Sequence, residues 1–106
     1  MNYAEMSDFE INRAVAIKSN MNCIFPRSAP PVVGVLSGEC YITYDPCNSW
    51  SDAGPIIQRE FIAINPVMKG WCASSDDDAE MYFTHENPLR AAMIVFLKMQ
   101  EGKWQR

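Results

Sequence analysis

The clearest structural signal in the chain is the segment Asn87-Pro88-Leu89-Arg90-Ala91-Ala92-Met93-Ile94-Val95-Phe96-Leu97. Asparagine is a favoured N-cap, and a proline directly after it is preorganised for the first helical turn. Gly102 is placed to end the helix as its C′ residue. Between these signals, apolar residues follow the i, i+3, i+4, i+7 spacing of a helix; they are Leu89, Ala92, Met93 and Phe96. We predict a helix here that supports the fold, with Phe96 in the core.

This helix is apolar on every side, because residues 91–97 contain no polar side chain. Such a helix is usually buried on more than one face. Ile94 and Leu97 fall on the face opposite Leu89 and Met93, where a small domain normally meets water. Leaving both in water would forfeit roughly 1.5–3 kcal/mol each. We therefore expect the chain to form a homo-oligomer, a dimer, and its interface candidates are Ile94, Leu97 and Trp104.

Upstream of this helix, five segments are rich in strand-forming residues; they are Val32–Leu36, Cys40–Tyr44, Phe61–Asn65, Trp71–Ser74 and Glu80–Thr84. Ser37-Gly38 is a turn signal that joins the first two segments into a hairpin, with Val32–Leu36 as an edge strand. Asn65-Pro66 is expected to end the third segment. The last three segments are expected to form an antiparallel sheet.

Two further helices are predicted. Residues 8–18 begin with a capping box, in which Ser7 is the N-cap and Glu10 stands at N3. Residues 49–59 form the second helix, kinked or divided by Pro55. The expected fold class is α+β, with about three helices packed on a small, mostly antiparallel sheet of three to four strands. Residues 1–106 are expected to form a single domain.

Length, charge and hydropathy exclude several classes of protein. The chain has 106 residues, 48 % of them hydrophobic and 21 % charged, which is typical of one globular domain. The formal net charge of −4 counts against nucleic-acid binding that is driven by phosphate contacts. No run of 18 apolar residues predicts a membrane span. The N-terminus lacks the basic and apolar regions of a signal peptide, so a cytoplasmic location is expected.

The cysteines and the single histidine give no pattern of a metal or catalytic site. Cys23, Cys40, Cys47 and Cys72 include no C-x-x-C pair. His85 with Cys47 or Cys72 is the one conceivable nucleophile–base pair, and no orienting motif surrounds it. We expect reduced thiols that pack as small hydrophobes, no catalytic residues, no metal, no cofactor and no enzymatic activity.

The charges are unevenly distributed along the chain. Residues 1–85 hold 11 acids and 5 bases, whereas residues 86–106 hold 2 acids and 4 bases. The acidic run at residues 76–80 is most simply a solvated loop, although it could bind a cation or a basic protein. The basic C-terminal segment with Trp104 could contact nucleic acid weakly. This asymmetry favours a surface that binds a protein.

Four segments resemble the NinX-like proteins of lambdoid, P22-type bacteriophages and prophages. They are Ser7-Asp8-Phe9-Glu10-Ile11-Asn12, Asp45-Pro46-Cys47-Asn48, Asp52-Ala53-Gly54-Pro55-Ile56-Ile57 and the helix segment quoted above. The resemblance implies no catalytic residues, since its motifs consist of caps and core residues. It implies a small accessory protein in the cytoplasm of the bacterial host.

This accessory protein is expected to act by protein–protein interaction, with a host or phage protein as a possible partner. Two alternatives stay open. One is a nucleic-acid-associated factor in phage replication or recombination. The other is an enzyme or small-ligand-binding protein whose site is not visible in the sequence.

Overall fold

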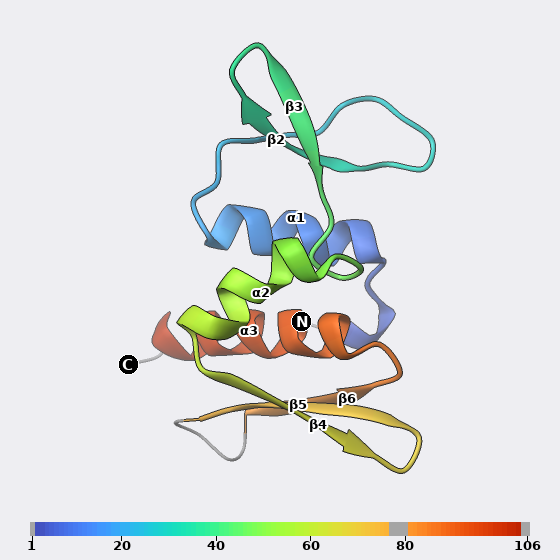
Figure 1. Cartoon of the computed structure of the whole chain (residues 1–106), viewed down its shortest axis with the longest axis vertical. Helices are drawn as coiled ribbons and strands as arrows, with labels where there is room; N and C mark the ends of the chain where they lie inside the picture. The colour runs from blue at the N-terminus through green and yellow to red at the C-terminus, as the bar shows by residue number, and fades with distance from the viewer. Residues whose placement is uncertain (1, 77–80, 105–106) are drawn as a thin grey trace.

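A long helix, α3 (Pro88–Trp104), lies between a helical layer and one of two sheets (Figure 1). The structure is a computed structural model that describes residues 2–76 and 81–104. Its elements follow in the order η1 (Tyr3–Glu5), α1 (Asp8–Lys18), β1 (Cys23–Ile24), β2 (Val33–Ser37), β3 (Cys40–Tyr44), α2 (Trp50–Arg59), β4 (Ile62–Val67), β5 (Gly70–Ser75), β6 (Tyr82–His85) and α3 (Pro88–Trp104).

The helix predicted from residues 87–97 is present and buried on all sides. Its N-cap is Asn87, whose side-chain oxygen accepts the backbone N–H of Leu89 at 2.9 Å. Every residue of 89–97 is buried, with Phe96 in the core as predicted. The helix continues past Gly102 to Trp104, so the prediction that Gly102 ends it is wrong.

The predicted exposed face of α3 does not exist. Ile94 is 0 % exposed and Leu97 is 3 % exposed within a single chain. The reason is that α3 is enclosed by its own chain, with the β4–β6 sheet on one side and α1 and α2 on the other (Figure 1). Ile94 and Leu97 are therefore not interface residues, and the reason given for self-association on this face is lost. The side chain of Trp104 lies outside the described part of the chain.

The strands before α3 form the sheet that covers it, here called sheet B, with the antiparallel order β4-β5-β6. Pro66 was expected to end its first strand, but β4 continues to Val67 and Pro66 pairs with Trp71. A proline is tolerated there because β4 is an edge strand. At the turn, a Cβ on Gly70 would lie 2.6 Å from the carbonyl oxygen of His85, so only glycine fits.

A second antiparallel sheet, here called sheet A, has the order β1-β2-β3. The predicted hairpin is present, with Ser37 paired to Cys40 and Gly38 in the left-handed region at φ 67°. The α+β class is confirmed, but the strands form two sheets instead of one. The prediction of Val32–Leu36 as an edge strand is wrong, because β1, a two-residue strand that was not predicted, makes β2 the central strand.

The two shorter helices are present where they are predicted. The predicted capping box of α1 is complete, with both the Ser7 and the Glu10 side chains bonded to the opposite backbone N–H. α2 runs as one helix from Trp50 to Arg59, so Pro55 does not divide it, which was one of the two forms predicted. Within the described residues, no helix is long and apolar enough to cross a membrane.

Candidate functional site

The family-like segments meet in one polar cluster between α1, the β3–α2 turn and the start of α3. Asn12 is at its centre. Its amide donates to the carboxylate of Asp45 at 2.8 Å, and its carbonyl oxygen accepts the backbone N–H of Cys47 at 3.1 Å. Asn48 donates to Asp8 at 3.1 Å, and Asn87 donates to the backbone carbonyl of Cys47 at 2.6 Å. The cluster therefore ties three segments that are distant in sequence.

Arg90 closes this cluster from α3. Its guanidinium lies 2.6 Å from the carboxylate of Asp8 and donates to the backbone carbonyls of Tyr3 and Met6. The arginine is buried, so these partners compensate for the loss of water around its charge. Each bond ends on a group of the same chain. The cluster thus holds the N-terminal segment on α3, which is a structural role.

Cys47 sits inside the cluster and is a poor nucleophile. It is fully buried, and burial together with the nearby charge of Asp8 raises the pKa of its thiol to about 12, against a weaker opposing effect of Arg90. Thiolate chemistry needs a lowered pKa. His85 is occupied elsewhere, since its Nδ1 accepts the backbone N–H of Asn87 at 2.9 Å. Among the described residues, no hydrogen bond joins the histidine to Cys47 or Cys72.

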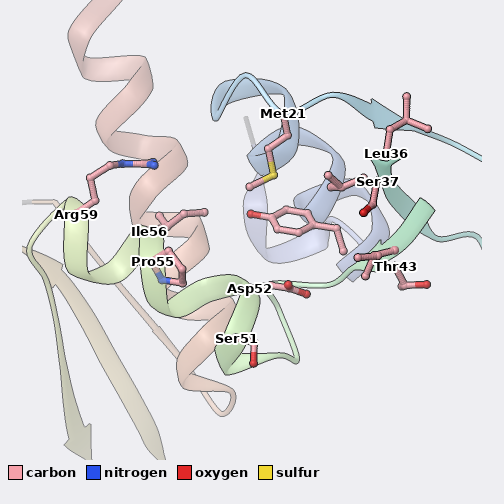
Figure 2. Close-up of a pocket in the computed structure, with 12 residues that line it drawn as sticks. Met21, Leu36, Ser37, Thr43, Ser51, Asp52, Pro55, Ile56 and Arg59 are labelled. Carbon is pink, nitrogen blue, oxygen red and sulfur yellow. The ribbon is translucent and has the colours of Figure 1, made fainter. Parts of the chain in front are cut away.

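An open groove lies between sheet A and α2 (Figure 2). Its volume of about 390 Å³ falls within the range of small-ligand and peptide-side-chain pockets. Leu36, Ser37 and Thr43 line it from sheet A, across from Asp52, Pro55 and Ile56 on α2, as Figure 2 shows. We call it the hairpin groove; its full lining is Met21, Val35, Leu36, Ser37, Ile42, Thr43, Tyr44, Ser51, Asp52, Pro55, Ile56 and Arg59.

The hairpin groove contains a buried hydroxyl without a partner. Tyr44 lines it and is 5 % exposed, and its hydroxyl has no hydrogen-bond partner among the described residues. Leaving a hydroxyl dry and unpaired costs about 1–3 kcal/mol. Burial, and then the charge of Asp52, raises the pKa of Tyr44 to about 12, so the group stays a hydrogen-bond donor at neutral pH.

Charged groups flank this hydroxyl on α2. The carboxylate of Asp52 accepts the backbone N–H of Asp45 at 2.9 Å, which ties the end of β3 to the first turn of α2. Arg59 lies at the other end of α2, and its charge opposes the effect of Asp52 on the pKa of Tyr44. The groove thus combines an apolar lining with a buried donor and one charge of each sign.

Two of the side chains that line the hairpin groove are apolar and exposed. Ile42 is 64 % exposed on β3, and Leu36 is 39 % exposed on β2. Scattered exposed apolar residues are ordinary, but a concentration of them beside a groove is typical of a binding surface.

The predicted basic segment is partly used inside the fold. Arg90 belongs to the polar cluster, and Lys98 donates to the backbone carbonyl of Tyr82 at 3.1 Å while it lies over the ring of Phe83. Lys103 and the Trp104 side chain fall outside the part that is described, as does Arg106. Four of the five residues of the acidic run 76–80 also fall outside it. No metal-holding group of histidine, cysteine or acidic side chains occurs in the described residues.

Sequence reasoning missed the hairpin groove. The groove depends on the angle between sheet A and α2, which no local pattern specifies. One signal was available, since Tyr44 directly precedes Asp45, the residue that connects the hairpin to α2.

A family model described as Bacteriophage P22, NinX matches residues 2–100 of the chain. No curated protein matches its sequence. The match spans nearly the whole chain and all the segments of the polar cluster, so the chain belongs to the NinX family of bacteriophage P22.

Proposed function

We propose that this phage accessory protein acts by binding a segment of a host or phage protein in the hairpin groove, without catalysis. The observation that carries the proposal is the buried, unpartnered hydroxyl of Tyr44 in an open apolar groove. Native proteins rarely leave such a group unsatisfied, and the exceptions often belong to functional sites. The hydroxyl is buried beneath the groove surface, so an acceptor on a bound segment would reach it once the lining side chains move aside, and an apolar side chain would cover the lining.

The properties of the remaining reactive groups support a non-catalytic role. Cys47 is buried with a raised pKa, and the imidazole of His85 accepts a backbone N–H at the start of α3. Both groups serve the packing and capping of α3. The charge distribution also fits a protein partner, since Arg90 and Lys98 are committed to contacts inside the chain.

The proposal is tested by comparing partner capture by four forms of the chain from phage-infected cells. Leu36→Asp places a charge in the groove, and Met68→Asp is its matched control, because Met68 is a fully exposed apolar residue in the sheet B turn. A partner retained by the native chain and by Met68→Asp should be lost from Leu36→Asp. A partner that Leu36→Asp retains would exclude the groove as its site.

Tyr44→Phe, the fourth form, separates binding from stability. It removes the unpaired hydroxyl and keeps the ring, so the free energy of unfolding should rise by about 1 kcal/mol. Binding of the captured partner should weaken at the same time, because the bound segment loses a hydrogen bond. Calorimetric unfolding and the affinity of the purified partner measure the two effects. A variant that is less stable than the native chain would show that the hydroxyl is already satisfied.

A further inference from the structure

The three longer edge strands of the two sheets differ in how they are protected from pairing with another chain. In sheet B, the hairpin closes at Val67 and Gly70, so in β4 the odd-numbered residues face β5 and the even-numbered ones face outward. Pro66 therefore removes a backbone donor from the outer edge of β4. On the opposite edge, Lys98 occupies the outward carbonyl of Tyr82 in β6. Proline and lysine are the usual devices that block an edge.

Sheet A carries no such device on its long edge. β1 is only two residues long, which limits pairing on that side. β3 has five residues, Cys40-Tyr41-Ile42-Thr43-Tyr44, without proline, lysine or any charge. All of them except Tyr44 are exposed. The segment is rich in β-branched and aromatic residues, which makes it a strong template for strand pairing.

The outward backbone groups of β3 can be assigned. The N–H of Leu36 bonds to the carbonyl of Asn22 on the β1 side of β2, so Val35 and Ser37 must face β3. Their partners in the register are Ile42 and Cys40. The backbone groups of Tyr41 and Thr43 therefore point away from the sheet, and these four groups have no backbone partner in the described part of the chain.

We propose that two copies of the chain form a symmetric dimer in which β3 pairs antiparallel with β3 of the second copy. Pairing centred on Ile42 places Tyr41 opposite Thr43 of the partner and Thr43 opposite Tyr41 of the partner. In this register alone, every outward N–H and C=O of β3 bonds to a group of β3 in the other copy. The two strands then share four hydrogen bonds. It also brings the two Ile42 side chains together across the two-fold axis, where non-hydrogen-bonded pairs approach most closely.

A second copy fits this edge because the strand is neutral and self-complementary. The nearest acids flank the paired segment, and the register sets Glu39 of one copy opposite Asp45 of the partner at each end, where like charges weaken the pairing. The carboxylate of Asp45 is held toward its own chain by Asn12 and Asn48. The interface is small, since it consists of two five-residue strands and the Ile42 and Tyr41 side chains, whereas a stable complex buries roughly 1,200 Å² or more. We therefore expect a weak dimer that depends on concentration.

The dimer would extend sheet A to six strands and place both hairpin grooves on the same face. Its basis is the outward backbone of β3, although the Ile42 and Thr43 side chains also line the groove proposed to bind a partner protein. Variants that test the two proposals are separate, because Leu36 and the hydroxyl of Tyr44 make no backbone contact on this edge.

Sedimentation of the native chain, Thr43→Pro and Thr43→Val from low to high micromolar concentration tests the dimer. Thr43→Pro removes an outward N–H without disturbing the bonds to β2, and by symmetry it removes two of the four interstrand bonds. We expect the dissociation constant to rise at least about tenfold. Thr43→Val keeps the N–H and should behave as the native chain does. A native chain that stays monomeric, or a dimer that Thr43→Pro leaves unchanged, would overturn the proposal.

Disulfide formation tests the register and does not depend on how well Thr43→Pro folds. In Ile42→Cys, the two new thiols lie at a non-hydrogen-bonded pair with Cα atoms about 4.5 Å apart, within disulfide reach. The two native Cys40 residues stand four positions apart along the ladder, roughly 13 Å, which is out of reach. Mild oxidation should link Ile42→Cys through residue 42 and leave the native chain unlinked. A native dimer linked through Cys40, or an unlinked Ile42→Cys, would contradict the register.

Discussion

Sheets A and B have the same number of strands and the same antiparallel topology, but they differ in what covers them. Sheet B packs on α3 through all three of its strands. Sheet A touches the helical layer mainly where β2 meets α1, and four of the five residues of β3 are exposed. One part of this small chain is therefore packed on both sides, while the other presents apolar surface, a groove and an open strand edge.

Removal of a core side chain from α3 should give the largest loss of stability. Phe96→Ala should lower the free energy of unfolding by about 3–5 kcal/mol, because the side chain is fully buried in α3. Ile42→Ala, on β3, removes a side chain that is 64 % exposed and should cost less than about 1 kcal/mol in the monomer. Urea unfolding at low chain concentration measures both. Equal losses in the two variants would remove the distinction between the sheets.

A smaller loss of stability is expected when the polar cluster that joins the two halves is disrupted. Asn87→Ala removes the cap of α3 and the donor to the Cys47 carbonyl, and we expect a loss of about 2 kcal/mol. Asn65→Ala, at an exposed position of β4, is the control and should change stability by less than about 0.5 kcal/mol. Thermal unfolding followed by circular dichroism compares them. An Asn87→Ala variant as stable as the control would show that the cluster is dispensable.

The buried thiol gives the cluster a dependence on alkaline pH. The pKa of Cys47 is raised from 9.0 to about 12 in the folded chain. Above about pH 9 the thiol ionises in the unfolded chain but not in the folded one, so the free energy of unfolding falls between pH 9 and 12. From Cys47 alone, the loss by about pH 10.5 is about 2 kcal/mol, at 1.4 kcal/mol for each pH unit. Urea unfolding at both pH values should show a smaller loss in Cys47→Ala. Identical losses would mean that the thiol ionises freely in the folded chain.

Local signals in the sequence predicted most of the elements. The capping box at Ser7 and Glu10, the Asn87-Pro88 start of α3 and the Ser37-Gly38 turn each depend on neighbours in the chain, and each agrees with the structure. These signals are readable because a cap or a tight turn needs particular residue types within a few positions.

The wrong or missing predictions concern mainly which elements pack against each other. Alternating hydrophobicity marks a strand but does not specify the sheet that it joins, so two sheets were expected as one. The sequence predicts an interface at Ile94 and Leu97 because a small domain rarely encloses a helix on every side. The hairpin groove was missed for the same reason, since it arises where Tyr44 and α2 approach in space. Such features depend on tertiary packing, which a single sequence specifies only through all its contacts together.

Amide hydrogen exchange of the native chain most directly tests whether sheet B and α3 form the stable half while sheet A is the loosely held binding half. Core amides exchange only by global unfolding, whereas amides of a weakly packed unit exchange through local opening at lower free energy. We expect the amides of β5 and of residues 91–97 to share the highest opening free energy. The amides of Val35 and Ile42, which bond across the hairpin, should open at a free energy several kcal/mol lower. Equal protection of the two sheets would contradict this division of the molecule.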